Sequence, residues 1–155
     1  EICVRGRNIM PGYLNNPEGT RAAFWEDGWF RSGDIGRFDP DGYLFIVDRL
    51  KDMIITGGEN VYPKEVEDVL YARPEVEECA VIGLPDAEWG EKVTAFIVAR
   101  PGEKIGSEAL RAFLKSRISA FKVPKEFRVV SELPKSPAGK ILKRQLRKEV
   151  EDNLP

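Results

Sequence analysis

One stretch indicates how the chain is divided into parts: Asp48-Arg49-Leu50-Lys51-Asp52-Met53-Ile54-Ile55-Thr56-Gly57-Gly58-Glu59-Asn60-Val61-Tyr62-Pro63. It begins with four charged residues between two apolar, strand-like runs, which is typical of a joint. The sequence before this joint has mostly β character, whereas strands and helices alternate after it. Alternation in this proportion over about a hundred residues predicts a small α+β fold of packed layers. We therefore expect two parts, residues 1–49 and residues 50–155.

The first part reads as a β-rich segment with one short helix. An alternating run at residues 1–6 predicts a strand, and Asn16 as a cap before proline predicts a helix over 17–24. Turn chemistry at residues 40–42 predicts a hairpin over 37–47. The chain opens in the middle of a strand pattern without an initiator Met, so we expect it to be a piece of a longer protein.

The second part is expected to form a short central sheet with helices packed on it. Its expected strands are residues 53–55, 78–83, 92–99 and 127–130. Its expected helices are residues 63–71, a helix capped by Ser107 with apolar positions at Leu110, Phe113, Leu114 and Ile118, and a terminal helix marked by Leu142, Leu146 and Val150.

Composition disfavours several classes of function. Apolar residues make up 42% of the chain and the formal net charge is −2, so bulk charge indicates neither a nucleic acid nor a membrane as partner. The absence of histidine removes the commonest general base and the commonest transition-metal ligand. Cys3 and Cys79 lack CxxC spacing, so we expect no disulfide framework, no metal site and a cytoplasmic location. No transmembrane-length apolar run and no signal-peptide pattern is present.

Charge is distributed unevenly along the chain. Residues 57–91 hold ten acidic and two basic residues, whereas residues 111–148 hold twelve basic and two acidic residues. The basic run is either a solvated face of mixed use or a site for a polyphosphate ligand. A nucleic-acid surface is a third interpretation, although aromatic side chains for stacking are scarce there.

The loop Leu133–Ile141 presents a lysine just before the terminal helix. Its two prolines and Gly139 can hold Lys140 in a defined place. Gly139-Lys140 invites comparison with a phosphate-binding P-loop, but Pro134 and Ile141 occupy positions where that motif needs Gly and Ser or Thr. Lys140 is therefore either a solvent-exposed residue of the first helical turn or a cation presented to a ligand.

Three further features have structural as well as functional interpretations. Gly57-Gly58 after a strand forms an ordinary turn, or a place where a ligand approaches the backbone closely. Asp34, beside a glycine turn, is a turn residue or a carboxylate that accepts hydrogen bonds from a sugar diol. Arg49 lies among charged residues that would make it a surface ion-pair partner. Each signal is weak alone.

Taken together, the order and spacing of these features resemble one family. The runs Arg31–Asp34, Asp48–Glu67 and Pro134–Lys140 resemble the motifs of the adenylate-forming superfamily, which includes acyl-CoA synthetases, luciferases and peptide-synthetase adenylation domains. The resemblance covers essentially the whole chain. It implies that residues 1–49 are the β-rich end of a large N-terminal adenylation domain and residues 50–155 a mobile C-terminal lid.

The resemblance also implies roles for residues that contact ATP. Asp34 would bind the ribose hydroxyls of ATP and of the acyl-adenylate, and Arg49 would contact the same nucleotide. Lys51 falls on the hinge position about which the lid rotates between the two half-reactions. Lys140 would be the catalytic lysine that reaches the substrate carboxylate and the α-phosphate.

For coenzyme A, the resemblance implies a second set of residues. Gly57-Gly58 would line the tunnel for the pantetheine arm, and Trp89 and Phe121 would contact the CoA nucleotide. Some relatives have a basic residue where this chain has Val123, so Lys122 is expected to take over contact with the CoA phosphates.

The implied activity is that of an ATP-dependent acid:CoA ligase, which forms an acyl-adenylate and then an acyl-CoA thioester and releases AMP and pyrophosphate. Mg²⁺ would accompany ATP. The motifs resemble fatty or aromatic acyl-CoA synthetases more than peptide synthetases. The acyl pocket and the phosphate loop would lie in the large N-terminal domain, so the 155 residues alone are expected to be inactive. The alternatives are a non-catalytic binding or regulatory module of the same fold, and the lid of a peptide-synthetase adenylation domain.

Overall fold

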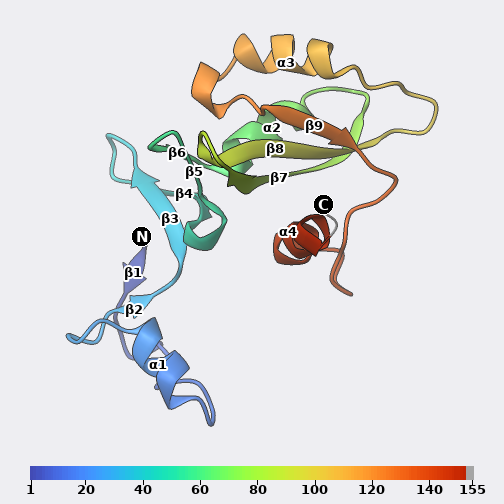
Figure 1. Ribbon diagram of the computed structural model, residues 1–155. Coiled ribbons are helices and arrows are strands. Elements are labelled where there is room, and N and C mark those ends of the chain that lie inside the picture. Colours follow the sequence, from blue (N-terminus) through green and yellow to red (C-terminus); the bar gives the residue numbers. More distant parts are fainter. Residues whose placement is uncertain (153–155) are drawn as a thin grey trace. The chain divides into compact units, whose positions relative to one another are not determined.

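The computed structural model describes residues 1–152 and contains two compact units, Glu1–Lys51 and a second unit that begins at Asp52 (Figure 1). Both units contain β-sheet and helix, so the expected α+β class is confirmed. The division falls between Lys51 and Asp52, two residues beyond the boundary expected from the sequence.

The first unit consists of two small antiparallel sheets and one helix. Its elements are β1 (Cys3–Val4) paired with β2 (Phe30–Arg31), β3 (Asp34–Phe38) paired with β4 (Leu44–Arg49), and α1 (Pro17–Ala23). The helix begins as expected, because Asn16 Oδ1 accepts a hydrogen bond from the Gly19 N–H at 2.8 Å. The sequence did not predict β2, because two residues are too short to show an alternating pattern.

The second unit is built on a five-stranded sheet with the order β6-β5-β8-β7, in which β9 also pairs with β8. Its strands are β5 (Ile54–Thr56), β6 (Glu59–Val61), β7 (Val76–Asp86), β8 (Gly90–Ala99) and β9 (Glu126–Val129). Its helices are α2 (Pro63–Tyr71), α3 (Ser107–Lys115) and α4 (Lys143–Asp152), with short 3₁₀ turns η1 (Leu50–Asp52), at the division, and η2 (Ala120–Lys122). Only β8 and β9 are parallel, because α3 carries the chain back between them. None of the helices in the described residues has the length and apolar character that crossing a bilayer requires.

Side-chain alternation along the long strands creates a core on each face of this sheet. On β7, Cys79 and Val81 pack in the core that also contains the apolar faces of α2 and α3. Ala80 and Ile82 point the other way and pack in the core that contains Leu146 of α4. Helices therefore cover both faces of the sheet (Figure 1).

Several details differ from the sequence-based expectation. β6 was not predicted: Gly57 and Gly58, with φ of +58° and +82°, form the two-residue turn of a tight β5–β6 hairpin. β7 is longer than expected and passes through Pro85, which an edge strand tolerates because its outer position needs no ladder hydrogen bond. The cap of α3 is Gly106, and Ser107 is the first helical residue.

The outer edge of β7 is covered by side chains of α2. Glu67 Oε1 accepts the Val81 N–H at 2.7 Å. Tyr71 Oη accepts the Cys79 N–H at 3.2 Å and donates to the Cys79 carbonyl at 3.4 Å. Glu67 and Tyr71 lie about one helical turn apart, so they meet alternate residues of the strand.

An ion-pair cluster joins the start of β9 to β8. Glu126 accepts a hydrogen bond from Arg128 Nε at 2.6 Å, and its other oxygen lies 2.8 Å from Lys92 Nζ. The hydrogen bond from Arg128, followed by that from Lys92, lowers the pKa of Glu126 below its ordinary value of 4.5. The ionised carboxylate therefore stabilises the folded second unit.

We expect Glu126→Gln to lower the free energy of unfolding at pH 7 by less than about 1 kcal/mol, because the pair is partly exposed. Since the folded pKa is depressed, this stabilisation is present above pH 4.5 and is lost as the pH falls through the folded value. The free energies of unfolding of wild type and variant, measured with urea, should differ at pH 7 and become equal in acid. A difference that persists in acid, or an equal loss in the exposed Glu132→Gln control, would contradict this assignment.

Candidate functional site

Asp34 and Arg49 form an ion pair across the β3–β4 hairpin. They are register partners, and Arg49 Nη1 lies 3.1 Å from Asp34 Oδ1. The Asp34 side chain is 25% exposed and that of Arg49 47% exposed. The pair therefore offers carboxylate oxygens for hydroxyl groups and guanidinium donors for an anion on one accessible surface.

Hydrogen bonds from neighbouring segments fix the backbone at Asp34. Ser32 Oγ accepts the Asp34 N–H at 3.0 Å and donates to the Ile2 carbonyl at 2.7 Å. The Ile2 N–H donates to the Asp34 carbonyl at 2.7 Å, and the Leu50 N–H donates to the Gly33 carbonyl at 2.7 Å. The turn before β3 and the end of β4 are thus held together, which places the two charged side chains side by side.

Lys51 is the last residue of the first unit. It is the middle residue of η1 and its side chain is exposed. A short turn between two compact units is a place where a few backbone torsions can change without disturbing a core. This location is compatible with a hinge, and the role itself stays a prediction.

The loop that carries Lys140 is anchored at its base in the second core. Leu133 is buried there, and Ile141 packs against the same cluster. Lys135 and Ile141 form an isolated β-bridge, and the Leu142 N–H donates to the Pro134 carbonyl at 2.8 Å. The segment is therefore a small hairpin with both of its arms held.

A tight turn at the tip of this hairpin presents Lys140. Ser136 Oγ accepts the Lys140 N–H at 3.2 Å, while the Ser136 carbonyl accepts the Gly139 N–H and the Ser136 N–H donates to the Lys140 carbonyl, both at 2.8 Å. Because α4 begins at Lys143, Lys140 precedes the helix and does not lie in its first turn. Its side chain is exposed, and its ammonium has no ion-pair partner among the side chains that the structure describes.

The acidic and basic runs of the sequence meet in the fold of the second unit. Three ion pairs join them: Lys122–Glu65 at 2.7 Å, Lys135–Glu78 at 2.5 Å and Lys143–Glu67 at 2.7 Å. Part of the basic run therefore serves internal pairing, which is none of the three interpretations that the sequence suggested. Lys140 differs from these three lysines because its charge stays available.

Gly57 and Trp89 are in contact beside the β5–β6 hairpin. The Gly57 N–H donates to the Trp89 carbonyl at 2.9 Å, and a Cβ on Gly57 would lie 3.0 Å from the indole ring. A Cβ on Gly58 would meet no atom within 4 Å, so the second glycine faces open space. Lys125 Nζ lies 3.7 Å from the centroid of the Trp89 ring. The glycines, the indole and this ammonium thus form one surface.

Lys125 is a candidate that the sequence did not reveal. No motif marks it, and its contact with Trp89 exists only because the fold brings the β7–β8 turn next to the segment before β9. The predicted Lys122 lies close by in sequence, but both oxygens of Glu65 bind its ammonium, at 2.8 and 2.7 Å. Phe121 is partly exposed, and Val123 is buried in the core and cannot contact a ligand.

The Lys140 loop and the Gly57–Trp89 surface lie toward opposite ends of the second sheet. Trp89 belongs to the β7–β8 turn, which is closed by the strand partners Asp86 and Gly90. Lys135, in the Lys140 loop, instead forms an ion pair with Glu78. Glu78 and Asp86 are eight residues apart on β7, which corresponds to about 26 Å. Figure 1 shows the β5–β6 hairpin at one end of the sheet and the segment after β9 leaving from the other.

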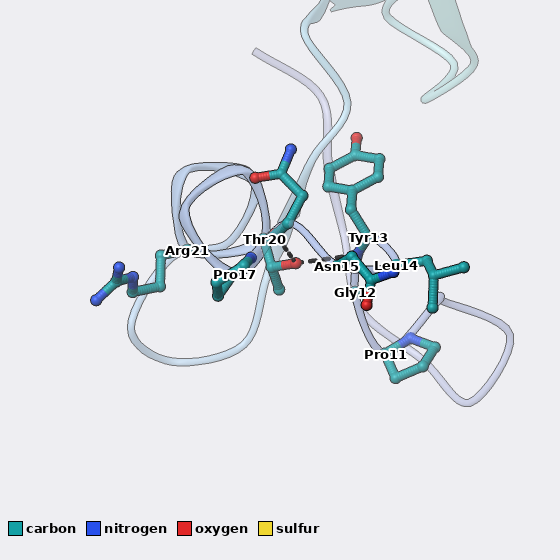
Figure 2. Close-up of a pocket in the computed structure, with 9 residues that line it drawn as sticks. Pro11, Gly12, Tyr13, Leu14, Asn15, Pro17, Thr20 and Arg21 are labelled. Atoms are coloured by element: carbon teal, nitrogen blue, oxygen red, sulfur yellow. Dashed lines mark hydrogen bonds between the residues drawn. The ribbon is translucent and has the colours of Figure 1, made fainter.

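Two other features take no part in the candidate site. Burial raises the pKa of Cys79 to about 12, so its thiol stays protonated at neutral pH and is no nucleophile. A hollow of about 810 Å³ in the first unit is lined by residues 11–17, Thr20 and Arg21 (Figure 2). Thr20 Oγ1 accepts the Tyr13 N–H there at 2.9 Å. None of the predicted site residues lines this hollow.

Known proteins are similar in sequence to this chain over almost its whole length. The family model described as the AMP-binding enzyme C-terminal domain matches residues 65–140. A feruloyl-CoA synthase from Amycolatopsis sp is 51% identical over 148 residues, which are 96% of this chain and 30% of that protein. A long-chain-fatty-acid–CoA ligase from Bacillus subtilis (strain 168) is 48% identical over 153 residues, which are 99% of this chain and 27% of that protein.

Solved structures show the same relationship. ATP-bound MatB from Rhodopseudomonas palustris is 43% identical and matches with a TM-score of 0.89, over 97% of this chain and 30% of MatB. Apo MatB matches at the same identity and coverage with a TM-score of 0.70. The chain thus spans about 30% of the length of the relatives it matches. The motifs, the fold and these comparisons agree: the chain belongs to the AMP-binding, adenylate-forming enzyme family and carries its C-terminal domain at residues 65–140.

Proposed function

We propose that the chain is the C-terminal portion of an AMP-forming acid:CoA ligase, in which Lys140 is the catalytic lysine. The Lys140 loop is the observation that carries this proposal. Both arms of the loop are anchored, and the Lys140 ammonium is exposed and has no ion-pair partner among the described side chains. A lysine used only for solubility would need no such anchoring.

In the first half-reaction, a substrate carboxylate attacks the α-phosphorus of ATP. A new O–P bond forms, and pyrophosphate leaves with the electron pair of the broken P–O bond. Two anions approach each other in this step, so a cation at the reacting oxygens lowers the barrier electrostatically. We assign that cation to Lys140. Asp34 would hold the ribose hydroxyls, and Arg49, 3.1 Å from Asp34, would orient that carboxylate and contact the nucleotide.

In the second half-reaction, the CoA thiolate attacks the carbonyl carbon of the acyl-adenylate, a C–S bond forms and AMP leaves. Gly57-Gly58 would let the pantetheine arm pass close to the backbone, since Gly58 faces open space. Trp89 and Phe121 would contact the CoA nucleotide. We add Lys125 as a phosphate-binding candidate beside Trp89. Lys122 would bind phosphate only by giving up its pairing with Glu65.

The two half-reactions would use different ends of the second unit, which supports a hinge at Lys51. One orientation cannot bring both the Lys140 loop and the Gly57–Trp89 surface to the same reacting atoms, because most of the length of β7 separates them. MatB gives independent support. Its two structures match this chain with TM-scores of 0.89 and 0.70 at one sequence identity, so the matched segment of MatB differs in conformation between them.

The remaining assignments concern substrate, metal and location. The names of the relatives, a feruloyl-CoA synthase and a long-chain-fatty-acid–CoA ligase, support an aromatic or fatty acid as substrate. We propose that Mg²⁺ enters with ATP on its phosphates. The described residues contain no cluster of acidic or cysteine side chains suited to hold the metal, so none is assigned to it. ATP, CoA and two free cysteines fit a cytoplasmic enzyme.

The test is an assay of the full-length protein with ATP, Mg²⁺, CoA and a panel of fatty and aromatic acids. We expect acyl-CoA, AMP and pyrophosphate in equal amounts with at least one acid. The 155-residue chain alone should give no thioester, because only the full-length protein would supply the acyl pocket and the phosphate loop. Thioester formation by the isolated chain would refute this division of labour, and ATP binding without turnover of any acid would favour a regulatory module.

A further inference from the structure

Lys143, the first residue of α4, is held by an ion pair that the reaction described above does not use. Lys143 Nζ lies 2.7 Å from Glu67 Oε1, and the same oxygen accepts the Val81 N–H at 2.7 Å. Glu67 belongs to α2 and Val81 to β7. One carboxylate oxygen therefore joins α2, β7 and the start of α4. Lys143, at that start, lies three positions after Lys140.

This pair is more enclosed than the other lysine pairs of the second unit. The side chains of Lys143 and Glu67 are 17% and 15% exposed. Those of Lys135 and Glu78 are 38% and 28% exposed. Removing one partner of an enclosed pair leaves the other charge uncompensated and draws it toward water. The Lys143–Glu67 pair should therefore hold the start of α4 more firmly than an exposed pair could.

The connection from Lys143 back to Lys140 has little slack. Leu142 is hydrogen-bonded to Pro134 at 2.8 Å, and Ile141 forms a bridge with Lys135. Because these bonds join both arms of the hairpin, a shift at the start of α4 would move the hairpin as a whole and Lys140 with it. Misplacing a reacting group by about 1 Å can lower a rate by about 100-fold.

We propose that Glu67 and Lys143 are positioning residues for Lys140. The sheet fixes the Glu67 carboxylate through Val81, Glu67 holds Lys143, and Lys143 fixes the point at which the loop enters α4. The ammonium of Lys140 is thereby kept where the attacking carboxylate and the α-phosphate meet. This inference rests on the role proposed for Lys140 and concerns two residues that contact no substrate themselves.

The test uses Lys143→Met, Lys143→Arg and Glu67→Gln in the full-length enzyme. ATP–pyrophosphate exchange measures adenylation, and prepared acyl-adenylate with CoA measures thioester formation. We expect Lys143→Met and Glu67→Gln to lower kcat for adenylation by about 10- to 100-fold. The KM for ATP and the rate of thioester formation should stay within about two-fold. Lys143→Arg keeps a cation for Glu67 and should recover most of the rate.

Lys64→Met is the matched control, because it removes a lysine from the exposed Lys64–Asp68 pair on the same helix as Glu67; its adenylation rate should stay close to wild type. Glu67→Gln keeps an oxygen acceptor for Val81, so this variant carries the test if Lys143→Met does not fold. Any of three results would overturn the proposal. The rates of both half-reactions could fall equally, or adenylation could stay normal in Lys143→Met and Glu67→Gln. The third result is that Lys143→Arg adenylates no faster than Lys143→Met.

Lys140→Ala, assayed in parallel, separates this inference from the proposed function. Normal adenylation by Lys140→Ala overturns the proposed function itself. Slow adenylation by Lys140→Ala together with normal adenylation by Lys143→Met overturns only the positioning role.

Discussion

Lys140→Ala in the full-length enzyme is expected to slow acyl-adenylate formation by about 100- to 1,000-fold. The substitution would remove the cation that we propose offsets repulsion between the attacking carboxylate and the α-phosphate. The fold should not change, because the side chain is exposed and no described acidic side chain pairs with its ammonium. ATP–pyrophosphate exchange under saturating acid and ATP measures the effect directly.

The same variant should form thioester from prepared acyl-adenylate and CoA at a rate close to wild type. The reason is that the second half-reaction is assigned to the Gly57–Trp89 surface, toward the other end of the sheet from the Lys140 loop. Lys148→Ala, at an exposed lysine of α4, is the control for loss of one positive charge. Equal losses in both half-reactions, or an equal loss in Lys148→Ala, would show that Lys140 acts through general charge or stability.

Lys51→Pro should affect the two half-reactions in the opposite way to Lys140→Ala. It should slow thioester formation at least about ten-fold more than adenylation. Proline fixes φ near −65° and removes the backbone N–H, so it restricts the torsions that a hinge must change. Lys51 is suited to this test because it is exposed and lies in a short turn at the division between the units. Each half-reaction would be measured separately, as for Lys140.

Lys51→Ala separates the effect of backbone torsion from that of charge at the proposed hinge. It removes the ammonium but leaves the backbone free, so both half-reactions should stay close to wild type. If alanine and proline have the same effect, the side chain of Lys51 matters rather than its backbone freedom. If proline lowers both half-reactions equally, the hinge assignment is wrong.

Local sequence patterns predicted the elements that depend on local chemistry. The helical spacing of Val66, Val69 and Leu70 correctly predicted α2 over Pro63–Tyr71. Asn16 and Pro17 predicted the start of α1. β2 and β6 were missed because neither has a local strand signal: β2 has only Phe30 and Arg31, and β6 begins with the polar residues Glu59 and Asn60.

In the candidate site, too, sequence motifs indicated some residues, whereas other contacts appear only in the fold. The order of motifs marked Asp34, Arg49 and Lys140, but only the register of β3 and β4 shows that the first two side chains meet. The contact of Lys125 with Trp89 and the Glu67–Lys143 pair join residues far apart in sequence. The uneven distribution of charge was visible in the sequence. That part of this charge is neutralised by internal ion pairs, such as Lys122–Glu65, depends on the tertiary fold.

The covered part of the β7 edge has a consequence if the second unit moves as proposed. An open strand edge is a template on which a strand of another chain can pair, which leads to swapped or aggregated assemblies. A domain that turns in every catalytic cycle cannot rely on a neighbouring domain to shield such an edge. Here Tyr71 of the same unit binds the N–H and the carbonyl of Cys79, and Glu67 binds the N–H of Val81. The moving part would thus carry its own protection against self-association through every position it visits.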